Sequence, residues 1–212
     1  MLNSPISAEA INSFKSIGTA TIHEANQQSG AMNSKIKPLK DTMKVCGIAL
    51  TVEVRPGDNL GLHQALMVAK KGDVIVAQAG GFSESGLWGE IMTIAAMERG
   101  AAGLVIDGAV RDVESAPRLG FPIFSAGICM KASGKNFKGR INVPITCGAV
   151  LVNPGDLVVG DADGVVVVPS KEVDQVLKKS LEREKKEAGL IDRLKKGELT
   201  IHLLGLAEKI KE

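Results

Sequence analysis

Aromatic residues are scarce in this chain, which has no tyrosine, one tryptophan and five phenylalanines among its 212 residues. Proteins that bind single-stranded nucleic acid commonly stack bases on aromatic side chains, and this sequence offers few such platforms. Lysine and arginine (26) nearly balance aspartate and glutamate (24), so no strong overall charge attracts nucleic acid either. We therefore expect no nucleic-acid partner.

Cysteine and long hydrophobic runs are also rare. Cys46, Cys129 and Cys147 are odd in number, lie far apart and show no CxxC spacing, which argues against a disulfide framework and against a zinc knuckle. We expect reduced, mostly buried thiols. No segment approaches eighteen uninterrupted apolar residues, and the first residues lack a basic start followed by an apolar core. The sequence therefore predicts a cytoplasmic protein with no membrane partner.

Glycine is abundant, with 24 residues, and it separates segments of alternating helical and extended pattern. Ser7 is predicted to cap the first of two short helices. We place Pro117 in a loop. Helices are predicted at 59–72 and 90–99, and strands at 45–54, 73–81, 103–109, 121–127 and, as several short pieces, 141–169.

This alternation predicts a single mixed α/β domain over residues 1–212. Residues 1–37 would hold the N-terminal helices, and a charged helical tail would occupy 170–212. An apolar stripe on the tail should pack on the body or on another subunit, and it comprises Val173, Val176, Leu177 and Leu181. Alternation alone does not distinguish a doubly wound sheet from a layered β/β/α body.

The first candidate site is the glycine cluster "AGGFSESGLWGE" (79–90), between a predicted strand and a predicted helix. Glycines let a ligand approach the backbone, and the unpaired N–H groups of a helix's first turn attract a carboxylate or phosphate. The cluster matches neither GxGxxG nor GxxxxGK[ST], so it gives little support to a nucleotide site. The alternative is a glycine-rich turn without a ligand.

The second candidate is "DGAVRDVES" (107–115), where a predicted strand delivers Asp107, Arg111 and Asp112 to its carboxyl end. Open α/β sheets bind their ligands at this end. Arginine can bind a carboxylate or an oxyanion, and an aspartate can hold a hard cation such as Mg²⁺. The alternative is a surface ion pair without function.

Other polar residues are expected to be structural. The three histidines, His23, His63 and His202, show no metal-binding spacing. The structural role is least certain for His63. The segment "GDADGV" (160–165) lacks the terminal glutamate of a calcium loop and is predicted to be a turn between strands.

The segment "GLWGEIMTIAAMERGAAGLVIDGAVRDV" (86–113) closely resembles the family that contains 4-hydroxy-4-methyl-2-oxoglutarate / 4-carboxy-4-hydroxy-2-oxoadipate aldolases and the regulator of ribonuclease activity A. The resemblance extends over most of the chain, through "TATIHEAN", "RPGDNLGLHQAL", "KKGDVIVAQAGG", "NPGDLVVGDADGVVVVP" and "REKKEAGLIDRLKKGEL". It implies a layered β/β/α body like the swivelling phosphohistidine domain of phosphoenolpyruvate-utilising enzymes, with the helical tail added.

The resemblance also implies a class II pyruvate aldolase that requires Mg²⁺ or Mn²⁺. The family's motif is an acidic residue, twenty intervening residues and Arg-Asp, which here are Glu90, Arg111 and Asp112. By this pattern Asp112 binds the metal directly and Arg111 binds the keto oxygen of a 2-oxo acid substrate. The backbone from Gly89 through Ile91 and Met92 takes the substrate carboxylate. Oxaloacetate decarboxylation is expected from the same site.

Family members form homotrimers or hexamers, and an adjacent subunit's C-terminal helix completes each site. The matching residue here is Glu187 or, as the second choice, Glu184, which would act on the metal through water, as Glu90 would. The chain departs from the aldolase motif in two ways. Glu90 replaces an aspartate, and Ser115 stands where members often have an acidic residue, with Glu114 one place earlier.

Two alternative functions follow from the sequence. A Schiff-base aldolase needs a desolvated lysine, for which Lys131 and Lys135 are the candidates, although no apolar pocket is evident around them. A binding protein is the alternative of another class, because the family includes a regulator that docks on ribonuclease E and inhibits it.

Overall fold

The computed structural model describes residues 6–210, so residues 1–5 and 211–212 of the predicted domain lie outside the described residues. The strands are β1 (Lys37–Pro38), β2 (Val45–Glu53), β3 (Asp73–Gln78), β4 (Gly103–Val110), β5 (Ile123–Ile128), β6 (Arg140–Ile141), β7 (Ile145–Cys147), β8 (Val150–Val152), β9 (Leu157–Asp161) and β10 (Gly164–Val168). The α-helices are α1 (Ala8–Phe14), α2 (Thr19–Ala25), α3 (Leu60–Val68), α4 (Glu90–Glu98), α5 (Ser115–Leu119), α6 (Val173–Lys195) and α7 (Thr200–Leu203).

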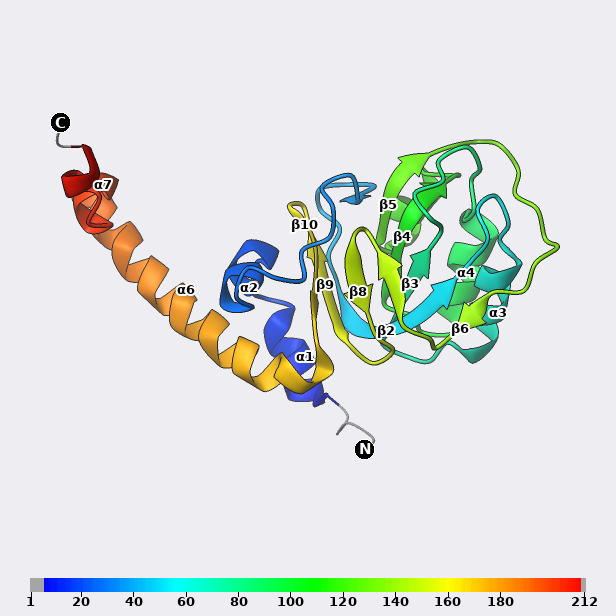
Figure 1. The fold of residues 1–212 in the computed structure, drawn as a ribbon, viewed down its shortest axis with the longest axis horizontal. Coiled ribbons are helices and arrows are strands. Elements are labelled where there is room, and N and C mark those ends of the chain that lie inside the picture. The colour runs from blue at the N-terminus through cyan, green and yellow to red at the C-terminus, as the bar shows by residue number, and fades with distance from the viewer. Residues whose placement is uncertain (1–5, 211–212) are drawn as a thin grey trace.

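The main sheet has the strand order β1-β5-β4-β3-β2-β9-β10, with β6 paired to β2 (Figure 1). Strands β2, β3, β4 and β5 are parallel, whereas β1, β9 and β10 run antiparallel to their neighbours. The two ends of this order approach each other, since β1 contacts β10 and the Lys37 ammonium donates to the Asp163 carbonyl. The sheet is therefore a nearly closed barrel.

Three hydrophobic clusters hold the layers together. Helices α3, α4 and α5 cover one side of the sheet through buried residues such as Leu62, Met92 and Ala116. The β7–β8 hairpin packs Ile145 and Cys147 against the other side, which is lined by β-branched residues. Helices α1, α2 and α6 cover β9 and β10. The predicted mixed α/β class and the layered β/β/α body are thus confirmed.

The predicted strands and helices are present with small differences at their ends. Ser7 caps α1 as predicted, because its hydroxyl accepts the Ala10 N–H at 3.1 Å. The loop predicted around Pro117 was wrong, since this residue lies in the short helix α5. Pro117 is the third residue of that helix, and in the first turn a missing N–H costs no intrahelical hydrogen bond.

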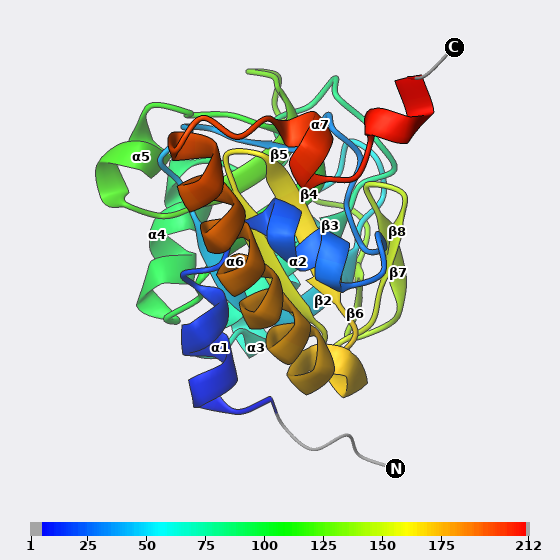
Figure 2. The same ribbon diagram turned by 90° about the vertical axis from the view of Figure 1, so that its left-hand side faces the viewer.

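The C-terminal helix α6 runs from the body outward, and α7 lies at its far end (Figure 1). Figure 2 shows α6 lying beside α1 and α2, both of which it contacts. Val173 and Val176 of the predicted stripe are buried here, and Leu177 is partly buried, but the side chain of Leu181 is 48% exposed. Between residues 6 and 210, no helix is long and apolar enough to cross a membrane.

All three cysteines are free, as expected; Cys147 is buried, whereas Cys46 and Cys129 are half-buried. Burial raises the pKa of the Cys46 thiol to about 11, against the opposing charge of Lys15. Burial also raises the pKa of the Cys147 thiol well above its ordinary value. Both side chains are therefore neutral thiols at pH 7 and poor nucleophiles.

Candidate active site at the end of strand β4

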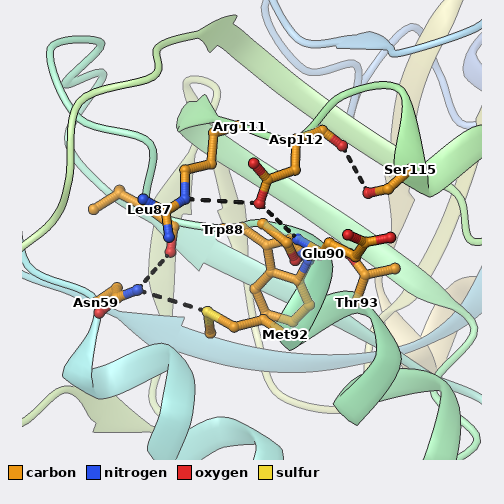
Figure 3. A network of polar contacts seen from close by, with 10 residues as sticks. Asn59, Leu87, Trp88, Glu90, Met92, Thr93, Arg111, Asp112 and Ser115 are labelled. Carbon is orange, nitrogen blue, oxygen red and sulfur yellow. Dashed lines mark hydrogen bonds and ion pairs between the residues drawn. The ribbon is translucent and has the colours of Figure 1, made fainter.

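The segment 86–88 runs alongside strand β4 and brings the start of α4 next to the Arg111–Asp112 pair (Figure 3). The Leu87 N–H donates to the Ala109 carbonyl at 2.9 Å, and the Arg111 N–H donates to the Trp88 carbonyl at 2.8 Å. These two backbone hydrogen bonds align residues that are more than twenty positions apart in the sequence. The two candidate motifs of the sequence therefore form one site.

Asp112 adopts a left-handed backbone conformation, with φ of 55°. This conformation is uncommon for residues other than glycine and costs conformational energy. It turns the carboxylate back toward α4, where Oδ2 accepts the Glu90 N–H at 3.0 Å. The same oxygen lies 3.8 Å from the Arg111 Nε. The local chain is thus arranged to present one carboxylate beside one guanidinium.

Gly89 makes this arrangement possible because a side chain there would collide with Asp112. A Cβ atom added at Gly89 would lie 2.4 Å from the Asp112 Oδ2, and one added at Gly86 would lie 2.9 Å from the Arg111 Cβ. Such distances are well below van der Waals contact. The two glycines in this part of the cluster therefore let Arg111 and Asp112 lie directly on the backbone.

The first turn of α4 is fixed by a buried hydrogen-bond relay. The Trp88 indole Nε1–H donates to the Thr93 Oγ1 at 2.9 Å, and this hydroxyl donates to the Gly89 carbonyl at 3.0 Å. Trp88 is 1% exposed, so the relay is shielded from water. The orientation of the α4 N-terminus is consequently held by the core rather than by surface contacts.

A cavity of about 130 Å³ opens at this point. Its wall includes the α4 start and the end of β4, together with residues from α3 and from the loop before β6. The lining residues are Asn59, His63, Gly86, Leu87, Gly89, Ile91, Met92, Arg111, Asp112 and Lys135. Polar groups and apolar side chains therefore share one concave site, which is typical of sites for small ligands.

Glu90, the acidic residue of the motif, does not line this cavity. Its carboxylate accepts a hydrogen bond from the Arg118 guanidinium of α5 at 2.8 Å, and both side chains are exposed in part. The Glu90 carboxylate is thus engaged by Arg118 and not by the residues that line the cavity.

The carboxylate of Asp112 is suited to a hard divalent cation. Its side chain is 47% exposed and lies at the cavity, where Oδ2 contacts the Glu90 N–H and the Arg111 guanidinium and Oδ1 has no partner within residues 6–210. Among residues 6–210 no group of three or more His, Cys, Asp or Glu side chains could hold a metal ion. Mg²⁺ typically takes only one or two protein carboxylates and completes its octahedron with water and substrate oxygens, so a single carboxylate fits.

Three further residues belong to the cavity although the sequence motif does not include them. Asn59 is 6% exposed and donates to the Leu87 carbonyl, while its Oδ1 atom has no hydrogen-bond partner in the described chain. His63 and Lys135 line the same space. No spacing rule pointed to them, because they come from α3 and from an irregular loop. Lys135, considered only for Schiff-base chemistry, does border a cavity.

Burial lowers the pKa of His63, and the positive charge of Lys135 lowers it further. The imidazole is therefore neutral at pH 7, so that it can offer hydrogen bonds but no charge. Lys135 and Arg111 are then the two cations of the cavity wall.

Asp107, expected beside Arg111 and Asp112, lies apart from this cavity. Its Oδ1 accepts the Ala79 N–H, and its pKa is raised by burial against hydrogen bonds from the backbone of residues 79–81 and of Gly148. Asp107 therefore anchors the glycine turn that follows β3. The predicted turn "GDADGV" does join β9 to β10, and Asp161 there accepts the Thr19 N–H at 2.8 Å.

Glu184 and Glu187 lie on α6, on the opposite side of the sheet from α4 (Figure 1). Glu187 pairs with Arg183 at 2.8 Å, and Arg183 also approaches Glu24 of α2. Within one chain these glutamates cannot reach Asp112. Any contribution from them to this site has to come from another copy.

The family of this chain follows from comparison with known proteins. The family model described as RraA-like, Aldolase/RraA, matches residues 19–167. The chain belongs to the RraA-like family. The matched range contains Glu90, Arg111 and Asp112 and ends before α6.

Similar proteins support the same assignment. The chain is 43% identical over 174 residues to a Halalkalibacterium halodurans protein named "Putative 4-hydroxy-4-methyl-2-oxoglutarate aldolase", covering 82% of this chain and 83% of that one. An uncharacterized Pseudomonas syringae protein of known structure has a TM-score of 0.83 at 28% identity, over 94% of each chain. Streptomyces coelicolor RraAS2, described as "an unusual member of the RNase ES inhibitor RraA protein family", has a TM-score of 0.78 at 30% identity, over 87% of this chain and 96% of that one. The relatives' names thus include both an aldolase and an inhibitor.

Proposed function

We propose that this chain is a divalent-metal-dependent pyruvate lyase that cleaves a 4-hydroxy-2-oxo acid such as 4-hydroxy-4-methyl-2-oxoglutarate. The observation that carries the proposal is the juxtaposition of Arg111, Asp112 and the α4 N-terminus around one cavity. A fixed cation, a fixed anion and unpaired amides are the groups that a 2-oxo acid and its metal require.

The N-terminus of α4 binds the substrate carboxylate in this proposal. The Glu90 amide is engaged by Asp112, which leaves the amides of Ile91 and Met92 in the first turn for an anion. Arg111 donates to the 2-keto oxygen from the adjacent wall. These two contacts orient the pyruvyl half of the substrate, with its C4 group directed along the remaining cavity.

The reaction then breaks the C3–C4 bond. The proton of the C4 hydroxyl passes to a water ordered by Glu90 or by Glu187, or else Glu184, of a neighbouring subunit. The C4–O bond becomes a carbonyl, and the C3–C4 electron pair forms the enolate of pyruvate. Negative charge grows on the former keto oxygen, where Arg111 stabilises it in the transition state more than in the ground state.

Asp112 would hold the metal, Mg²⁺ or Mn²⁺. When bound there, the cation supplies Lewis-acid polarisation of the substrate's carboxylate and keto oxygens. Oxaloacetate decarboxylation gives the same pyruvate enolate, so we propose this second activity for the same site.

Metal removal tests the proposed function directly. Pyruvate release from 4-hydroxy-4-methyl-2-oxoglutarate and from oxaloacetate should proceed with Mg²⁺, stop in EDTA and return when Mg²⁺ is added in excess. A lactate dehydrogenase-coupled assay follows the product, with substrate and Mg²⁺ alone as the blank. Turnover that persists in EDTA would instead support a Schiff-base mechanism through a lysine.

The similarity to an RNase ES inhibitor family supports a second candidate function, a regulator that binds ribonuclease E without acting on a small molecule. Two results together would favour this regulator over the lyase. The purified chain would release no pyruvate from either substrate, and it would bind ribonuclease E.

We also propose that the protein works as a homotrimer or hexamer, with α6 of one copy at the site of the next. Two observations support this arrangement. The far part of the tail exposes apolar side chains, including 48% of Ile191 and 60% of Leu199. Helix α4 exposes 81% of Ile91 at the rim of the cavity. Exposed apolar surfaces on opposite sides of a chain suit a closed ring of head-to-tail contacts.

Mixing two inactive variants tests whether Glu187 acts across subunits. Arg111→Ala and Glu187→Ala are each expected to be strongly impaired alone. In co-expressed mixtures, about one site in four should combine an intact Arg111 with an intact Glu187 if each site draws on two randomly chosen subunits. Activity should therefore reappear in the mixture, as measured by the coupled assay. No recovery in verified mixed oligomers would remove Glu187 from the reaction, because Glu187 cannot reach Asp112 of its own chain.

A further inference from the structure

A second cavity, of about 400 Å³, lies at the opposite end of the parallel strands from Asp112. Its wall includes residues at the start of β2 and the residues that directly precede β3 and β4, namely Gly72 and Ala102. Arg111 and Asp112, by contrast, follow the last residue of β4. The proposed lyase reaction uses no residue of this second cavity.

Helix α1 and the residues after it form one wall of the second cavity. Ile11 and Ile17 line it, and the Cys46 thiol of β2 donates a weak hydrogen bond to the Ile11 carbonyl at 3.5 Å. The match to the RraA-like family model begins only at residue 19. The second cavity therefore forms where a helix outside the matched range packs on the matched body.

The interior of the second cavity is apolar. Ile17, Val45 and Val159 line it and are only 3–4% exposed. Cys46 adds a neutral thiol, because burial raises its pKa to about 11. Pockets of roughly 300–1,000 Å³ with mostly apolar walls commonly bind small molecules. A ligand that enters this interior needs an apolar body, since a polar group buried there would lack hydrogen-bond partners.

Two exposed lysines stand at the rim of the second cavity. The Lys44 ammonium has no ion pair or hydrogen bond with any other of residues 6–210. The Lys15 ammonium donates to a neutral group, the amide oxygen of Asn12, at 3.0 Å. Its positive charge also lowers the pKa of the Cys46 thiol, so this ammonium lies close to the wall. Both cations are therefore available to an anionic group of a ligand.

The carboxylate that lines the second cavity, Asp161, is engaged by neighbouring groups. It accepts the Thr19 N–H at 2.8 Å, the Thr19 hydroxyl at 2.6 Å and the Asp163 N–H at 3.0 Å. It forms no ion pair with Lys15 or Lys44. The wall thus carries two positive charges and one negative charge, which favours an anionic ligand over a cationic one.

We propose that the second cavity is a binding site for a small amphipathic anion, an aliphatic carboxylate. Its chain fills the apolar interior, and its carboxylate pairs with Lys15 and Lys44 at the rim. The inference goes beyond the proposed function and does not depend on it, since neither Arg111 nor Asp112 contributes to this site.

Three probes separate the apolar and the charged parts of this recognition. Octanoate carries both the chain and the carboxylate, 1-octanol lacks the charge, and acetate lacks the chain. In calorimetric titrations octanoate should bind, 1-octanol should bind more weakly, and acetate should give no measurable binding. Failure of octanoate to bind would overturn the proposal, as when a second copy of the chain covers the cavity.

Substitution of the two lysines tests the contact with the carboxylate. Lys15→Met and Lys44→Met should each weaken octanoate binding roughly 3- to 10-fold, between the effects of an exposed ion pair and of a strong charge-assisted hydrogen bond. Neither should change binding of 1-octanol. Lys178→Met removes an exposed lysine of α6 that does not line the cavity, and this matched control should leave both affinities unchanged. Equal weakening of both ligands, or of neither, would overturn the role of the lysines.

Alkylation of Cys46 tests where octanoate binds. Iodoacetamide at mildly alkaline pH modifies accessible thiols, and peptide mass spectrometry follows each cysteine separately. Octanoate at about ten times its Kd should slow modification of Cys46 roughly 10-fold, because only about one molecule in eleven remains unbound. Cys129 is half-buried and does not line the second cavity, so its rate should not change. Octanoate binding without protection of Cys46 would place the ligand elsewhere and overturn the proposal. None of these readouts depends on pyruvate release.

Discussion

Replacing Arg111 with alanine is expected to lower kcat for pyruvate release roughly 10²-fold or more, the usual effect of removing a donor that stabilises a developing oxyanion. The side chain lies beside Asp112 at the cavity and is 42% exposed, so its loss leaves the core intact. The effect should appear mainly in kcat, because charge accumulates on the keto oxygen only as the C3–C4 bond breaks.

Two companion variants sharpen the test of Arg111. Arg111→Lys keeps the charge but loses the planar fork, and we expect partial activity between those of the wild type and Arg111→Ala. Arg140→Ala removes an arginine that pairs with Glu53 outside the cavity, and it should leave kcat unchanged. Steady-state kinetics on oxaloacetate with Mg²⁺ measure all three. Near-normal turnover by Arg111→Ala would exclude this residue from oxyanion stabilisation.

The architecture could be predicted from local pattern to a large extent. The β-branched runs at 45–54 and 103–109 became β2 and β4 because such runs fit a buried sheet, and Ser7 capped α1. Closure of the sheet into a near barrel could not be predicted. It depends on the contact between β1, which has only two residues, and β10.

The candidate site was predictable in part, by resemblance and by position. Placing Arg111 and Asp112 at the end of a strand was a local inference, and the strand does end at Val110. Their contact with Gly89 depends on the backbone pairing of residues 86–88 with β4, which leaves no sequence signature. The partner of Glu90 was missed for another reason. Arg118 lies on α5, and Pro117 had indicated a loop there.

Two residues that line the cavity, Lys135 and His63, could not be predicted from the sequence. Lys135 lies in an irregular loop beside Asn136, whose N–H donates to the buried carboxylate of Asp58, 78 positions earlier in the chain. His63 lies on α3, and the pattern of apolar residues along this helix does not indicate a cavity. Long-range polar contacts, rather than hydrophobic periodicity, determine both positions.

Gly89→Ala is expected to lower kcat roughly 10²-fold while the protein stays folded. The backbone of Gly89 has φ of −148°, which alanine adopts without strain, so the fold should tolerate the change. The new Cβ atom, however, would lie 2.4 Å from the Asp112 Oδ2 and must displace the carboxylate. When a group that positions the reacting atoms moves by about 1 Å, kcat can fall roughly 10²-fold.

Gly18→Ala is the matched control for Gly89→Ala. Gly18 is also a helix N-cap with negative φ, and a Cβ atom added there meets nothing within 4 Å. It should cost at most about 1 kcal/mol of stability and leave kcat unchanged. Thermal unfolding, Mn²⁺ titration and the coupled assay separate the effects, since Gly89→Ala should weaken metal binding and turnover together. Full activity with unchanged Mn²⁺ affinity would contradict this prediction. It would mean that catalysis does not require the Asp112 carboxylate to lie beside the N-terminus of α4, and that Asp112 does not bind the metal.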